Sequence, residues 1–257
     1  MSEYATWHAF YQSDLQAVWG LCVIPGRFLV YRGWLAIAGH GPQTQGVTPG
    51  AIRFVDRYAI LFALLTVVDP FFTGPLVRWL AIGDTLSGSA ISFAFVYLGD
   101  FRVFLLLFGV AALAAGHSLP LARAALWALI VPLFAGTLFA LAQAIGGDLA
   151  VGWLWLVYEL SFLALILGIR ARWLPRNVAP QDRATRNYLG FVCAYVATYY
   201  ALWPLADILI LVGGFDAGWA LRVIPNQLYY AFFIPVLWFR FFASRYASTS
   251  VSTQMSR

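Results

Sequence analysis

The chain has 257 residues, of which 62% are hydrophobic and only 11% are charged. A soluble domain usually carries about a quarter charged residues, so this composition excludes an ordinary soluble protein and predicts an integral membrane protein. All positively charged side chains behind the formal net charge of +5 are arginines, because the sequence has no lysine. An arginine excess in a membrane protein is typical of the positive-inside bias. We therefore expect the lipid bilayer, and no nucleic acid, as a partner.

The first apolar segment, residues 14–39, carries Arg27 and Arg32 near its centre and a break at Pro25. Each central arginine would cost roughly 2.5–3.5 kcal/mol in a membrane-spanning helix. We therefore expect an interfacial amphipathic segment, and a further membrane span is the alternative. Residues 40–52 are rich in turn formers, so residues 1–52 are predicted to be an N-terminal interfacial segment and linker.

Six further apolar segments follow, and long apolar runs of this kind are typical of transmembrane helices. They cover about residues 57–80, 87–115, 121–145, 150–169, 188–213 and 219–242. The sequence therefore predicts an all-α fold: a polytopic transmembrane helical bundle over residues 53–245, with six spans, or seven if residues 14–39 also cross. Residues 246–257 are predicted to be a flexible cytoplasmic tail.

Arginine placement predicts the orientation of the bundle. One loop, between the fourth and fifth spans, holds a dense group of arginines: Arg170, Arg172, Arg176, Arg183 and Arg186. Cytoplasmic loops carry such an excess, whereas the opposite loops carry Asp84, Asp148 and Asp216. We expect a plasma membrane location, such as the bacterial inner membrane, with both termini cytoplasmic. A seventh span would move only the N-terminus to the outside.

Charged residues inside the predicted spans are the main functional signal, because ionisable side chains are costly in lipid and usually functional. At 1.5 Å of rise per residue, Asp207 and Arg222 or Asn226 lie at matching depths on neighbouring spans, and this is the strongest predicted pair. Tyr200 and Trp203 share a helix face with Asp207. Likewise, Asn226, Tyr229 and Phe233 share a face with Arg222.

Asp100 and Arg102 lie in the middle of the second span, two positions apart. On a helix they point to nearly opposite faces, about 200° apart, so they cannot neutralise each other. Each needs its own partner on a different neighbouring helix, which predicts a central position for this span. We expect Glu159 to be the partner of Arg102, and the partner of Asp100 stays open.

The leading functional hypothesis is a protein of transport or sensing type, with an outward-opening intramembrane cavity for a small polar or ionic solute or for protons. Asp207, Arg222 and Asn226 would form its outer part, Glu159 and Asp69 its wall, and Asp100 with Arg102 its floor. The full predicted cavity set is Asp69, Asp100, Arg102, Glu159, Tyr200, Trp203, Asp207, Arg222, Asn226 and Tyr229.

Two alternatives stay open. Asp100 and Asp207 could form the acid–base pair of a membrane-embedded hydrolase acting on a lipid-like substrate, or the chain could be a structural or assembly subunit of a membrane complex.

Two cysteines and three histidines near helix ends predict no metal site, and no cofactor is expected. The 18% aromatic content suits an interfacial belt, including Trp155, and leaves a bound pigment, quinone or lipid open. Protein partners and catalytic residues stay unassigned.

Overall fold

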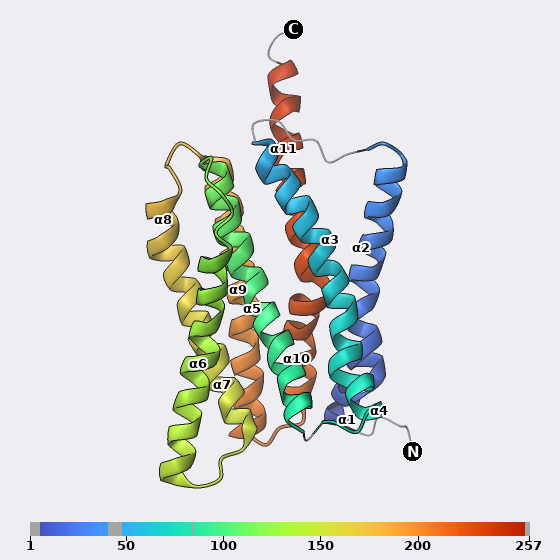
Figure 1. The fold of residues 1–257 in the computed structure, drawn as a ribbon, viewed down its shortest axis with the longest axis vertical. Helices are drawn as coiled ribbons and strands as arrows, with labels where there is room; N and C mark the ends of the chain where they lie inside the picture. Colours follow the sequence, from blue (N-terminus) through green and yellow to red (C-terminus); the bar gives the residue numbers. More distant parts are fainter. Residues whose placement is uncertain (1–5, 41–47, 84, 255–257) are drawn as a thin grey trace.

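The computed structural model describes residues 6–40, 48–83 and 85–254. Helix makes up 86% of the model, and the described residues contain no strand. Figure 1 shows long helices running side by side, roughly along one direction. The predicted all-α bundle is therefore confirmed.

The helices follow one another with short connections, and four π-helical turns continue neighbouring helices. In chain order the elements are α1 (Trp7–Gln12), η1 (Leu15–Trp19), α2 (Gly20–Ile37), α3 (Pro49–Phe71), η2 (Phe72–Leu76), α4 (Val77–Trp79), α5 (Leu86–Ala114), α6 (Leu121–Gly146), α7 (Val151–Gly168), η3 (Ile169–Trp173), α8 (Leu174–Asn177), α9 (Arg183–Leu211), α10 (Ala217–Asn226), η4 (Gln227–Phe232) and α11 (Phe233–Gln254). Prolines explain two of the π turns, since Pro75 lies inside η2 and Pro225 precedes η4; a proline removes a backbone donor from the helical ladder.

Six helices in the described part of the chain are long and apolar enough to cross a membrane. They are Leu15–Ile37, Pro49–Trp79, Leu86–Ala114, Leu121–Gly146, Val151–Asn177 and Arg183–Leu211. Five of them match the first five predicted spans closely. The predicted sixth span, 219–242, is helical within α10–η4–α11 but is not among the six.

The N-terminal segment differs from the expected interfacial arrangement. Residues 15–37 form one of the six long helices and pack along α3 (Figure 1). Arg32 is neutralised there: its Nε donates to Asp56 Oδ1 at 2.7 Å and its Nη2 to Asp56 Oδ2 at 2.6 Å. Trp238 Nε1 donates to the same carboxylate at 3.1 Å. Because this paired arginine is no longer an isolated charge, its cost does not prevent a buried helix, and residues 15–37 form a helix long and apolar enough to cross a membrane.

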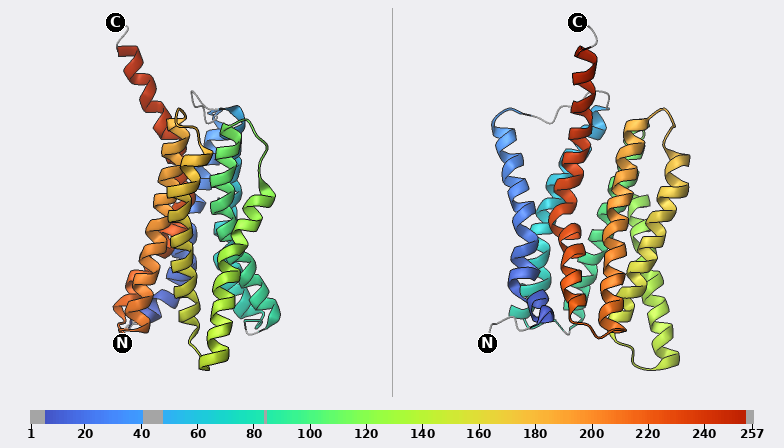
Figure 2. Two further views of the ribbon diagram at one scale, coloured as in Figure 1. Left: turned by 90° about the vertical axis from the view of Figure 1, so that its left-hand side faces the viewer. Right: turned by 180° about the vertical axis from the view of Figure 1, so that it is seen from behind.

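The second predicted span, α5, lies at the centre of the bundle, as expected from its two opposed charges. It contacts α3, α6 and α9, and Figure 2 shows neighbouring helices on both of its sides. Asp100, Leu106 and Leu107 have no exposed surface, and Arg102 is buried. Asp100 faces α7 and α9 whereas Arg102 faces α3 and η4, so the two side chains do point to different neighbours.

The described ends of the chain lie at opposite ends of the bundle (Figure 1). The loop between α8 and α9, with its arginines, lies at the same end as the C-terminus; we name this the arginine-rich end. Asp148 and Asp216 lie at the other end, where Asp216 contacts α1, and Asp84 falls outside the described residues. The six long apolar helices and α10–η4–α11 together traverse the bundle an odd number of times, so the two described ends lie apart. Residues 246–254 continue α11, and residues 255–257 of the predicted tail are not described.

Candidate functional site

Three charged side chains from three helices meet at the end of the bundle away from the arginine-rich end. Arg222 of α10 lies 2.8 Å from Asp207 of α9 through Nη1, and 3.3 Å from Glu159 of α7 through Nη2. We name these three residues the Arg222 cluster. Because α7 and α10 both pack against α9, residues at equal depth on the three helices come together. The predicted pairing of Asp207 with Arg222 is confirmed.

The Arg222 cluster holds two carboxylates for one guanidinium in a largely buried place. The side chains of Asp207 and Glu159 are only 2% and 4% exposed, and that of Arg222 is 15% exposed. Glu159 Oε2 is buried and accepts no hydrogen bond from any described residue. The two carboxyl groups also lie within hydrogen-bonding reach of each other, but neither can donate unless it holds a proton. A proton shared by the two carboxyl groups, or one further cation, would balance the charges of the cluster.

A pocket of about 450 Å³ opens beside the Arg222 cluster. Two cluster members, Glu159 and Arg222, line it together with Asn226. The rest of the lining is mostly aromatic: Tyr11, Trp155, Tyr158, Tyr200, Trp203, Trp219, Tyr229 and Tyr230, with Val96 and Gly152. We name this space the aromatic pocket. Its mixture of ring faces and a few polar groups is typical of a small-molecule site.

The short N-terminal helix α1 closes one side of the aromatic pocket. Its first backbone amides, those of Trp7 and His8, donate to the carboxylate of Asp216 at 2.7 and 3.1 Å. The His8 ring stacks on Trp219, with centroids 4.3 Å apart. Further along, Asn226 Nδ2 donates to the Tyr11 hydroxyl at 3.0 Å. A segment that the sequence analysis treated as outside the bundle thus supplies part of the pocket wall.

Asn226 also joins the two predicted helix faces. Its Oδ1 accepts a hydrogen bond from Trp203 Nε1 at 2.9 Å. Trp203 in turn packs on Tyr200 and Tyr229, with ring centroids 5.4 and 5.3 Å apart. The predicted stripes on α9 and α10–η4 therefore face each other, and Tyr200, Trp203 and Tyr229 line the same pocket.

Asp100 lies behind the pocket wall and does not form its floor. The Tyr158 hydroxyl donates to Asp100 Oδ2 at 2.6 Å, and the Tyr200 hydroxyl donates to Oδ1 at 3.2 Å. Both oxygens are thus occupied by tyrosines that themselves line the pocket. Since Asp207 takes its ion pair from Arg222, the two aspartates proposed as a hydrolase pair have separate partners.

Arg102 also lies behind the pocket, and its predicted partner is wrong. Glu159 pairs with Arg222, whereas Arg102 Nη2 donates to the backbone carbonyl of Tyr229 at 2.7 Å. Its guanidinium lies 4.1 Å from the centre of the Tyr229 ring and 4.5 Å from that of Phe233. The physical reason is the π turn η4, which interrupts the regular backbone ladder where the Tyr229 carbonyl accepts this hydrogen bond.

Asp69 lies outside the pocket lining as well. Its carboxylate accepts a hydrogen bond from Thr73 at 3.3 Å on the same helical stretch, although it also feels the charge of Arg102. Of the ten predicted residues, six line the pocket: Glu159, Tyr200, Trp203, Arg222, Asn226 and Tyr229. The other four stand behind them.

Several lining residues that helical spacing indicates were not predicted. Trp155 precedes Glu159 by four positions and Trp219 precedes Arg222 by three, so each shares a face with a predicted residue. Tyr158, the immediate neighbour of Glu159, shares a face with Trp155 instead. Trp155, expected in an interfacial belt, instead lines the pocket. Tyr11 had no such signal, because nothing in the sequence places α1 against α10.

The fold and the pocket together define a helical bundle with a partly aromatic, partly charged cavity near one end. Comparisons of the chain with protein-family models, with curated proteins and with solved structures found no match.

Proposed function

We propose that this chain is an integral membrane protein of transport or sensing type that binds a small organic cation in the aromatic pocket. The observation that carries the proposal is the Arg222 cluster at the pocket wall, where two buried carboxylates share one arginine. A cationic group that donates to Glu159 Oε2 would supply the missing charge and the missing donor together.

The charge balance of the wider core supports a cation. Among the described residues, four acids lie in this part of the bundle, Asp69, Asp100, Glu159 and Asp207, while Arg102 and Arg222 are the two cations that interact with them. Buried charges are normally paired. Acidic side chains outnumber arginines in this core, and each surplus acid must bind a proton or pair with a cation to be neutral; the core therefore favours a positively charged solute, or a proton, over an anion.

The aromatic lining supports an organic cation over a metal ion. Hard metal ions such as Ca²⁺ take six or more oxygen ligands, whereas ring faces attract organic ammonium groups within about 6 Å of their centres. Trp155, Trp203 and Trp219 bring three indole rings to this pocket. A solute with an ammonium group and an apolar body matches both kinds of lining.

The proposed orientation places the pocket on the outer side. Glu159 lies eight residues into α7, about 12 Å from its start, and Arg222 five residues into α10, about 8 Å from its start. The exposed arginines near the other end, including Arg53, Arg57 and Arg172, mark that end as cytoplasmic. The N-terminus is then outside and the C-terminus inside.

We expect cysteine labelling to report this orientation. In intact bacterial cells, a membrane-impermeant maleimide should label Asp148→Cys, whereas Arg176→Cys should react only after permeabilisation. Both parent side chains are exposed, and the native cysteines, Cys22 and Cys193, are buried, so background labelling should be low. The reverse pattern would show that the arginine-rich end faces outward.

Calorimetric titration of the purified chain in detergent tests the proposed ligand class. Three probes of similar size are compared: benzylammonium, benzyl alcohol and benzoate. Only the cation should bind saturably, and Glu159→Gln should weaken its binding by about tenfold or more, because that variant removes the surplus negative charge (each tenfold is 1.4 kcal/mol).

Asp148→Asn is the matched control, since it removes an exposed acid from the same end without touching the pocket. It should bind the cation as the parent does. Equal binding of all three probes, or unchanged binding by Glu159→Gln, would contradict the proposal.

A further inference from the structure

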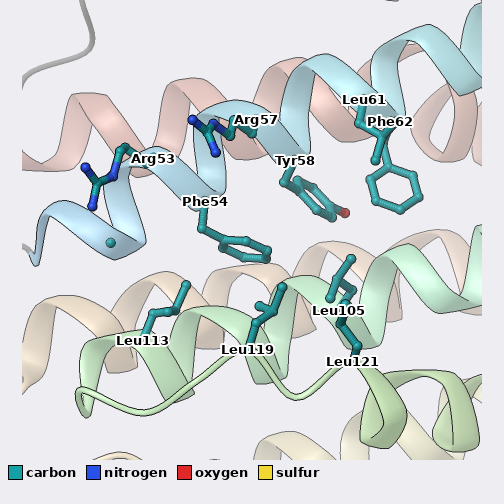
Figure 3. A pocket seen from close by; sticks show the side chains of 11 residues that line it. Arg53, Phe54, Arg57, Tyr58, Leu61, Phe62, Leu105, Leu113, Leu119 and Leu121 are labelled. Atoms are coloured by element: carbon teal, nitrogen blue, oxygen red, sulfur yellow. The ribbon is translucent and has the colours of Figure 1, made fainter.

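A second pocket, of about 490 Å³, lies between α3 and α5 at the arginine-rich end. In Figure 3 the rings of Phe54, Tyr58 and Phe62 point from α3 toward α5, and leucines point back toward them. Those leucines are Leu105, Leu113, Leu119 and Leu121, from α5, the following loop and the start of α6. We name this space the lateral groove. Its walls are apolar apart from two arginines.

The lateral groove is a fixed feature of the packing between α3 and α5. A Cβ at Gly109 would lie only 2.6 Å from the Phe54 ring and 2.9 Å from Leu119, so a larger residue there would have to displace these side chains. The Tyr58 hydroxyl donates to the backbone carbonyl of Arg102 at 2.9 Å. This buried hydrogen bond ties the groove wall to the central helix.

The two arginines at the groove, Arg53 and Arg57, lie one turn apart on α3 (Figure 3), and both are exposed. Neither has an ion pair or side-chain hydrogen bond with any described residue. Two other arginines near this end do have partners. Arg32 pairs with Asp56, and Arg123 lies 4.7 Å from the centre of the Phe108 ring.

We propose that the lateral groove is a binding site for an anionic phospholipid. The headgroup phosphate is held by the guanidinium groups of Arg53 and Arg57, and an acyl chain lies along the apolar wall between α3 and α5. Three observations on the structure support this occupant. The two side chains without a partner, Arg53 and Arg57, are positively charged. The groove wall beside them is apolar. The groove also lies at the arginine-rich end, and positive charge at such an end contacts anionic lipid in helical membrane proteins.

The geometry separates this occupant from a soluble anion. Two unpaired arginines at one-turn spacing suit the planar, multidentate recognition of a phosphate group. A soluble phosphate would use the arginines and leave the apolar wall empty, whereas a phospholipid covers both. The site is remote from the Arg222 cluster, so it does not depend on the function proposed above.

Native mass spectrometry of the full chain, released from detergent with graded amounts of phosphatidylglycerol or phosphatidylcholine, tests the site. The parent should retain phosphatidylglycerol in preference to phosphatidylcholine. The double variant Arg53→Gln/Arg57→Gln should bind phosphatidylglycerol about 30-fold more weakly, from the usual contribution of a basic residue near anionic lipid. Arg53→Lys/Arg57→Lys keeps both positive charges and should retain the preference for phosphatidylglycerol.

Arg172→Gln/Arg176→Gln is the matched control. It removes the same charge from the same end, at the same one-turn spacing, from exposed arginines outside the groove. Little change in this control supports the site. An equal loss in both double variants would show general surface attraction and overturn the proposal, as would unchanged binding in Arg53→Gln/Arg57→Gln. Competition by glycerol 3-phosphate at the lipid's own concentration would show that the headgroup alone binds, which also overturns it.

Discussion

Replacing Arg222 with glutamine is expected to lower the free energy of unfolding by about 3–5 kcal/mol, the usual cost of removing one partner from a buried ion pair. The reason is specific to the Arg222 cluster. Both Asp207 and Glu159 would lose their cation at once, while their side chains stay at most 4% exposed. Thermal unfolding in detergent, followed by tryptophan fluorescence, measures the change. Cation binding in the aromatic pocket should weaken as well, because its wall is disturbed.

Two further variants show whether charge is the cause. Arg78→Gln removes an exposed arginine, paired with Asp14 at the same end, and should cost no more than about 1 kcal/mol. The triple variant Arg222→Gln/Asp207→Asn/Glu159→Gln removes both stranded charges and should recover much of the lost stability. If the triple variant unfolds as easily as Arg222→Gln alone, the loss reflects packing, and the electrostatic account is wrong.

Gly99→Ala is expected to destabilise the bundle by about 1–3 kcal/mol, the usual cost of overpacking a core, and to distort the aromatic pocket. A Cβ at this position would lie 1.6 Å from the Tyr229 hydroxyl oxygen and 2.9 Å from the ring carbon that carries it. The Tyr229 ring cannot move freely, since it covers Arg102 and packs on Trp203. Thermal unfolding and the affinity for benzylammonium measure the two effects.

Tyr229→Phe supplies the test of this mechanism. It removes the oxygen that the new Cβ would meet, so Gly99→Ala/Tyr229→Phe should be more stable than Gly99→Ala alone. Gly136→Ala, on α6 with open space around its Cβ, is the control and should be neutral or stabilising by about 0.5–1 kcal/mol. If Gly99→Ala/Tyr229→Phe is no more stable than Gly99→Ala, the destabilisation does not come from a clash with the Tyr229 hydroxyl.

The sequence predicted five of the six long apolar helices, because long apolar runs and helix breakers depend on local composition. The pairing of Asp207 with Arg222 was also predictable, because a short loop fixes the relative depth of α9 and α10. Depth alone did not give the partner of Arg102. That contact needs the rotation of α5 about its axis and the irregular backbone of η4, and both depend on packing against several neighbours.

The N-terminal part of the chain shows a second limit. The two central arginines led us to predict that residues 14–39 do not cross the membrane. That prediction did not include the partner of Arg32, a residue 24 positions away on the next helix. Asp56 lies near the start of α3 and gave no sign of this role. Pairing across two antiparallel helices is a tertiary contact, and a cost calculated for a single helix cannot include it.

One consequence of the tyrosine layer over Asp100 concerns selectivity. Tyr158 and Tyr200 line the aromatic pocket on one side and donate to the carboxylate on the other. Hydroxyl groups can hand a proton along such a chain, since each is both donor and acceptor, but their rings leave no passage for a solute. If the chain binds a solute as proposed, this layer predicts that the solute stops at the pocket and that only hydrogen ions are exchanged between the pocket and Asp100.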